Sequence, residues 1–72
     1  MRSEQYKGFM LWGHAILQQN AILRSGRYAA GGTITKDNKV VEASSVLGEF
    51  VTEDEAELVG LQWAHAWVDG LG

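Results

Sequence analysis

The chain has 72 residues, 46% of them hydrophobic and 21% charged, and its six basic and nine acidic residues give a formal net charge of −3. This size predicts a single domain, residues 1–72, and the composition is that of a globular protein rather than a disordered chain. The sequence contains no cysteine, which excludes a disulfide framework and a thiolate zinc site. The negative charge does not favour attraction to nucleic acid or to an anionic membrane.

Residues 6–17 (Y-K-G-F-M-L-W-G-H-A-I-L) predict the first strand, because aromatic and branched side chains are enriched in strands. The most apolar part of it, residues 8–17, is too short to span a bilayer and lacks a signal-peptide cleavage pattern, so we expect a cytoplasmic protein without a membrane partner. Both faces of this strand are largely apolar: Phe9, Leu11 and Ala15 fall on one, and Met10, Trp12, His14 and Ile16 on the other. One helix behind the sheet can cover only one of these faces.

Residues 18–26 are ambiguous, since Asn20 and Ser25-Gly26 are turn signals and the apolar residues between them fit either an extended hairpin or a helical turn. Residues 27–36 alternate as a strand, and their small side chains at positions 29–32 predict close approach of another element, namely the helix with its tryptophans. Asp37-Asn38 predicts a tight turn. Residues 39–51 resume as a strand, with a bulge expected at Ser44-Ser45.

The C-terminal stretch 50–72 predicts a helix with a capping box formed by Thr52 and Glu55 and a left-handed stop at Gly70. Acidic residues at 53–55 complement the helix dipole. The three-and-four spacing predicts a buried stripe of Ala56, Val59, Gly60, Trp63, Trp67 and Leu71. The interior Gly60 implies that a strand or a ring packs directly on the helix backbone. Together these elements predict an α+β fold, in which an antiparallel meander of three strands, with a fourth left open, packs on one C-terminal helix.

The sequence contains few residues whose spacing would suit a catalytic, metal-binding or phosphate-binding site. His65 and Asp69 lie one helical turn apart, but His14 is the only other histidine, so we expect a solvated pair rather than a metal site. Ser44-Ser45 has no histidine at a nucleophile-base spacing, and the glycines at 31–32 lack the Lys-Ser/Thr of a phosphate loop. We therefore expect no enzyme, no catalytic residue and no cofactor.

The sequence gives more support to a protein-interaction surface than to a catalytic or metal-binding site. If the predicted stripe faces inward, Leu58, Leu61 and His65 lie on the flank or outer face of the helix. With Met10 and Trp12 on the doubly apolar first strand, they form the predicted interaction surface.

Three short segments resemble a known family: Tyr6-Lys7-Gly8, then G-R-Y-A-A at 26–30, then L-G-E-F-V-T-E-D-E-A at 47–56. They are similar to the Y-R-G, G-K-W-A-A and L-G-x-F-x-T-x-E-E-A segments of the plant Apetala/ethylene-response-factor DNA-binding domain. The resemblance implies a three-stranded antiparallel sheet packed on one helix. In that family the first strand is arginine-rich and lies in the major groove, whereas residues 9–13 here contain no arginine, so the DNA contact is not expected to carry over.

The whole chain also resembles a group of small proteobacterial proteins with a Y-K-G-F start, a G-x-Y-x-A strand and an E-A-x3-G-x2-W-A-x2-W-[IV]-D ending. Here that ending is Glu55-Ala56, Gly60, Trp63-Ala64 and Trp67-Val68-Asp69. The resemblance implies an accessory or prophage-associated protein, and it assigns no functional residue.

Three functions therefore stand as hypotheses. The first is a small accessory module without catalytic activity that binds a protein partner or self-associates, as a dimer in the simplest case. The second is a nucleic-acid-binding module of sheet-plus-helix type, which the charge disfavours. The third is an acidic phage-borne inhibitor of a host nucleic-acid-binding protein.

Overall fold

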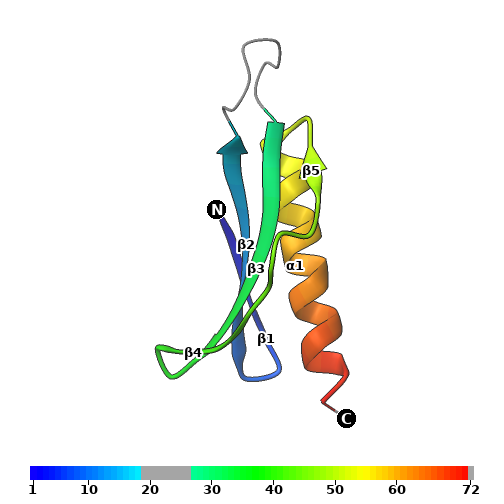
Figure 1. Ribbon diagram of the computed structural model, residues 1–72. Coiled ribbons are helices and arrows are strands. Elements are labelled where there is room, and N and C mark those ends of the chain that lie inside the picture. The colour runs from blue at the N-terminus through cyan, green and yellow to red at the C-terminus, as the bar shows by residue number, and fades with distance from the viewer. Residues whose placement is uncertain (19–26, 72) are drawn as a thin grey trace.

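The computed structural model describes residues 1–18 and 27–71, and it places one helix along one face of an antiparallel sheet (Figure 1). The strands are β1 (Arg2–Tyr6), β2 (Phe9–Gln18), β3 (Arg27–Lys36), β4 (Lys39–Ala43) and β5 (Glu49–Phe50), followed by the helix α1 (Glu53–Asp69). Strands β1 to β4 form a meander in sequence order, and the short β5 also pairs with β3. The α+β prediction is confirmed, and the fourth strand that it left open is present.

Two hairpins are closed by two-residue turns with positive φ. Asp37 and Asn38 have φ of 52° and 65°, which confirms the predicted tight turn, and Lys7 and Gly8 have φ of 50° and 85°. Backbone twist of this kind matches the twist of the flanking strands. The prediction of a single strand from residue 6 was wrong at its start, because Tyr6 ends β1 and the chain reverses before β2. The sequence of β1 (R-S-E-Q-Y) lacks the apolar signal that identifies strands.

The segment after β4 follows β3 without regular strand geometry. The amide of Ser44 donates to the carbonyl of Gly32 at 2.8 Å, and the Ser44 hydroxyl accepts from the Gly32 amide at 2.8 Å. The register shift lies between Ile34 and Thr35, opposite β4, so the prediction of a bulge at Ser44-Ser45 was wrong. The Ser44 hydroxyl instead accepts the hydrogen bond that the Gly32 amide would otherwise donate to a backbone carbonyl of a neighbouring strand. Of the ambiguous segment 18–26, only Gln18 is described, as the last residue of β2, and the alternatives for the rest lie outside the described residues.

The helix begins as predicted and ends differently. The hydroxyl of Thr52 accepts from the amide of Glu55 at 3.2 Å and donates to the Glu55 carboxylate at 3.1 Å, so the carboxylate meets the hydroxyl rather than the Thr52 amide. Gly70 has φ −73° and ψ −10°, which is right-handed, so the predicted left-handed stop was wrong. Its amide still donates to the carbonyl of Ala66 at 2.9 Å and simply extends the last helical turn.

Glycines set the distance between the helix and the sheet. A Cβ atom added at Gly60 would overlap the carbonyl oxygen of Gly31 and lie 2.9 Å from the Cα of Gly13. One added at Gly32 would lie 2.6 Å from Cε3 of Trp63. Carbon atoms in ordinary contact are about 3.5–4.0 Å apart, so no larger residue fits at these positions without displacement. The predicted close approach at residues 29–32 and the direct packing on Gly60 are therefore confirmed.

The buried stripe of α1 is rotated from the predicted one. The residues buried on the helix are Ala56, Glu57, Gly60, Leu61, Ala64 and Val68. Trp63 and Trp67 are only partly buried against the core, and Leu71 is exposed, so the indoles flank the interface rather than filling its centre. The physical reason is that the backbone of Gly60 packs directly on the sheet, which places the Trp63 ring beside this contact, against Gly32.

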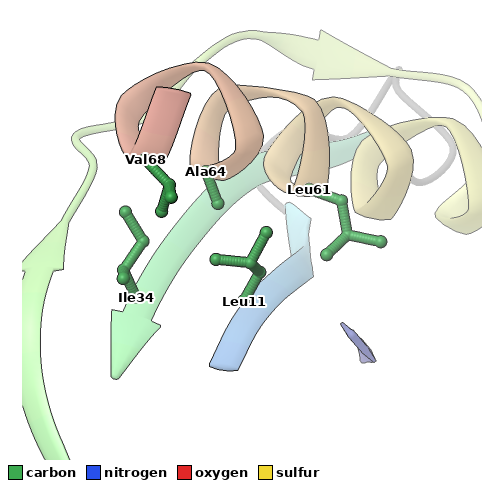
Figure 2. Packing of buried hydrophobic residues seen from close by; sticks show 5 residues of the cluster. All are labelled: Leu11, Ile34, Leu61, Ala64 and Val68. Carbon is green, nitrogen blue, oxygen red and sulfur yellow. The ribbon is translucent and has the colours of Figure 1, made fainter. Parts of the chain in front are cut away.

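Leucine, isoleucine and valine side chains fill the remaining core. Figure 2 shows Leu61, Ala64 and Val68 directed from α1 toward Leu11 of β2 and Ile34 of β3. Leu11 and Ile34 are fully buried. This core occupies the helix-facing side of the sheet only.

Candidate functional site

The candidate site is the face of the sheet that α1 does not cover, which we call the open face. Side chains alternate along a strand, and the odd residues of β2 face the helix, as the contact of Gly13 with α1 requires. The cross-strand register then shows which residues of β1, β3, β4 and β5 lie on the same face as the even residues of β2. The open face consists of Ser3, Gln5, Met10, Trp12, His14, Ile16, Gln18, Arg27, Ala29, Gly31, Thr33, Thr35, Val40, Ala43 and Glu49, of which Ala29 is buried. Among the residues that the structure describes, no helix lies on this side (Figure 1).

Aromatic rings on the open face are held by hydroxyl groups of β3. The indole Nε1 of Trp12 donates to Oγ1 of Thr35 at 3.0 Å. The imidazole Nε2 of His14 lies 2.9 Å from Oγ1 of Thr33. In the register Trp12 pairs with Thr33 and His14 with Gly31, so each ring leans diagonally to the next residue on the same face of β3. The indole N–H is thereby satisfied within the domain, and burying the ring against a partner would leave no unpaired donor there.

The open face carries apolar surface at both of its ends. Ile16 is 52% exposed and Val40 is 67% exposed, whereas Met10 and Trp12 are half-buried. A hollow of about 410 Å³ opens near the two hairpin turns, and Met10 and Trp12 line it together with the charged Lys36 and Asp37. A hollow of this size accommodates a protruding side chain of a partner.

Charge is distributed unevenly between the two sides of the molecule. Among the described residues, the register places two charged side chains on the open face, Arg27 and Glu49, at the end where β3 begins. The helix carries five acidic residues, namely Glu53, Asp54, Glu55, Glu57 and Asp69, and no lysine or arginine. The open face is thus the neutral side of a protein whose formal charge is −3.

Ion pairs on the opposite side connect β1 to α1. The buried carboxylate of Glu57 accepts from the N-terminal ammonium of Met1 at 2.6 Å and lies 3.4 Å from Nε of Arg2. The hydrogen bond from the ammonium, assisted by Arg2 and opposed by burial, lowers the pKa of Glu57 below its usual range. Glu57 therefore positions the polar edge strand on the helix, a role that its place in an acidic run did not indicate.

His65 and Asp69, which we expected to form a solvated pair on the helix, instead contact residues of β1 and of the turn that follows it. Oδ1 of Asp69 accepts from Nζ of Lys7 at 3.0 Å and from the hydroxyl of Tyr6 at 2.8 Å. These hydrogen bonds, that of Lys7 foremost, lower the pKa of Asp69 and raise that of Lys7. Nε2 of His65 lies 3.0 Å from the carboxylate of Glu4, and its ring packs edge-on against Tyr6. Within residues 1–18 and 27–71, no three His, Asp or Glu side chains gather as a metal ion would require.

The predicted interaction residues do not form one surface. Met10 and Trp12 lie on the open face, whereas Leu58 is 43% exposed on the outer side of the helix, across the sheet from them. Leu61 is only 7% exposed and belongs to the core, so its assignment to the outer flank was wrong. His65 contacts β1. The rotation of the buried stripe separates these residues, because it turns Leu61 inward and His65 toward Tyr6.

Several open-face residues were not included in the predicted surface. Ile16 and His14 continue the row of Met10 and Trp12, and the strand alternation already assigned them to the same face. Thr33 and Thr35 required the register of β2 on β3, which fixes the hydrogen bonds to the rings. The alternation of side chains along β2 was therefore the sequence signal that could have added His14 and Ile16 to the predicted surface.

Among the described residues α1 is the one helix, and it does not combine the length and the apolar character needed to cross a membrane. Comparisons with family models, with curated proteins and with solved structures found no match to this chain. The two resemblances drawn from short motifs therefore remain predictions, and the case for a function depends on the geometry above.

Proposed function

We propose that this chain is a small accessory module without catalytic activity that binds a protein partner through its open face. The observation that carries the proposal is the neutral row of Met10, Trp12 and Ile16 on the side of the sheet opposite the helix. Tryptophan and methionine are enriched in the centres of protein interfaces, where charged residues are depleted. The exposed isoleucine at one end adds apolar area that solvent does not favour.

The fixed orientation of Trp12 supports the same proposal. A side chain that already sits in one conformation loses little entropy when a partner covers it. The hydrogen bond to Thr35 holds the indole in place and occupies its donor. The hollow beside it offers a recess for a partner's side chain.

Nucleic acid is the weaker candidate for this surface. Bases stack on exposed aromatic rings, and Trp12 and His14 supply two rings on the central strand. Phosphate, however, requires lysine or arginine along the path of the backbone, and the open face has neither between its ends. The acidic helix adds repulsion on the other side.

The experiment compares two lysine variants that add the same charge to opposite sides of the molecule. Trp12→Lys alters the open face, and Leu58→Lys alters the outer side of the helix, where the leucine is already exposed. We expect Trp12→Lys to reduce binding of a neutral apolar dye and to remove proteins captured from a bacterial lysate, while Leu58→Lys retains both. Equal dye binding and capture by the two folded variants, checked by circular dichroism, would contradict the proposal.

A further inference from the structure

The partner for which the open face is best suited is a second copy of this chain. We propose that two copies associate face to face about a twofold axis, burying their open faces against one another. This inference rests on the proposed docking function and goes further by naming the occupant. A twofold interface uses the same patch on both subunits, so the patch must be compatible with itself.

Charge is the first argument for a second copy. Each chain carries a formal charge of −3, and the acidic residues of α1 lie on the side away from the open face. Two copies that met through their helices would bring like charges together, which costs free energy. Two open faces bring together no formal charge except Arg27 and Glu49, which lie at the end of each face and are opposite in sign.

Polar satisfaction is the second argument. Identical apolar faces are compatible only if neither leaves donors unpaired when water is removed. The indole N–H of Trp12 already donates to Thr35, and the Nε2 of His14 is paired with Thr33. Along the row from Met10 to Ile16 the second copy therefore need supply only apolar contact with the ring faces and with Ile16, whereas the exposed Ser3 and Gln5 on β1 stay at the solvated rim or pair with polar groups of the second copy.

The area of the open face is the third argument. Four strands about 4.8 Å apart, the central two of ten residues each, give this face roughly 500 Å². Two such faces bury about 1,000 Å² in total, which lies at the lower limit for a specific interface. The geometry therefore points to a reversible dimer that dissociates on dilution rather than to a permanent one.

The test is sedimentation velocity of the wild-type chain from about 5 μM to about 500 μM, a range that spans weak association. We expect the mean mass to rise with concentration toward twice that of one chain. Trp12→Lys and Ile16→Lys are expected to lower the association constant at least about tenfold, as loss of a central apolar contact does. Leu58→Lys is the matched control and is expected to leave it unchanged.

A second measurement locates the interface in the unmodified chain. In heteronuclear NMR spectra recorded over the same concentrations, the amide signals of Met10, Trp12 and Ile16 are expected to shift, and those of Leu58 and its helical neighbours to stay constant. This readout keeps the proposal testable if Trp12→Lys does not fold.

Three outcomes would overturn the dimer. They are a constant monomeric mass, association that survives both open-face variants but is lost in Leu58→Lys, and concentration-dependent shifts confined to the helix. A monomer whose dye binding and partner capture still depend on Trp12 would leave the docking function intact and refute only the second copy. A monomer that instead binds single-stranded oligonucleotides through Trp12 would refute both.

Discussion

The two adjacent glycines of β3 give the sharpest test of the packing. Gly32 faces the helix and Gly31 faces the open side, so the substitutions Gly32→Ala and Gly31→Ala add the same methyl group in opposite directions. The added Cβ at position 32 would lie 2.6 Å from Cε3 of Trp63 and 2.7 Å from the carbonyl oxygen of Gly60. At position 31 the nearest atom is Oγ of Ser44 at 4.0 Å, an ordinary contact.

The expected magnitudes follow from two effects. Replacing a strand glycine by alanine removes freedom from the unfolded chain and stabilises by about 0.5–1 kcal/mol where the residue fits. Overpacking costs about 1–3 kcal/mol, and at position 32 the backbone of Gly60 cannot move unless the whole helix shifts. We therefore expect Gly31→Ala to be neutral or slightly stabilising and Gly32→Ala to destabilise by about 1–2 kcal/mol.

Urea unfolding followed by far-ultraviolet circular dichroism measures both variants, at a concentration low enough to keep the chain monomeric. A loss of about 2 kcal/mol is large for a domain of this size, whose core supplies roughly 3–5 kcal/mol in total. The expected signature is a clear separation of the two urea midpoints. Equal midpoints, or a more stable Gly32→Ala, would refute the close contact between the helix and the sheet.

Three further predictions concern the core, the cap and the pH dependence. Leu11→Ala, at a fully buried position, should lower the free energy of unfolding by about 2–5 kcal/mol, so a folded variant with an unchanged urea midpoint would contradict the core. Thr52→Ala should cost about 1 kcal/mol in thermal or urea unfolding, because the Glu55 amide loses its acceptor, whereas Thr52→Ser should retain the stability. The pKa of Glu57 is lowered in the fold, so its contribution is present above the usual carboxylate range and is lost as the pH falls below about 5 through the lowered pKa. Glu57→Gln should therefore destabilise at neutral pH and flatten the acid limb of a stability–pH curve, and an acid limb unchanged from wild type would argue against the ion pair.

Local sequence signals determined much of this fold. The Asp37-Asn38 turn, the capping threonine and the alternation of β2 each depend on neighbours within a few residues, and all three were predictable. Gly60 and the small residues of β3 also indicated where the helix approaches the sheet, since a glycine inside a helix is unfavourable without a close contact.

Tertiary structure decided which side of the helix is buried. The three-and-four spacing admits more than one stripe on α1, and the indoles of Trp63 and Trp67 made one of them look the more apolar. The backbone of Gly60 packs directly on the sheet, the Trp63 ring lies beside this contact against Gly32, and β1 offers Glu57 a counter-charge through Arg2. These contacts involve residues of different elements that lie far apart along the chain, so the sequence spacing along α1 could not contain them.

The features of the open face likewise fall into those that the sequence predicts and those that only the folded sheet sets. The row of Met10, Trp12, His14 and Ile16 is a property of a single strand, and its period of two follows from the sequence alone. The hydrogen bond that fixes Trp12 depends on the register of β2 against β3, which only the folded sheet sets. The sequence by itself therefore determined which side chains share a face, and the tertiary structure decided that the helix covers the other one, because only there do the glycines permit close packing.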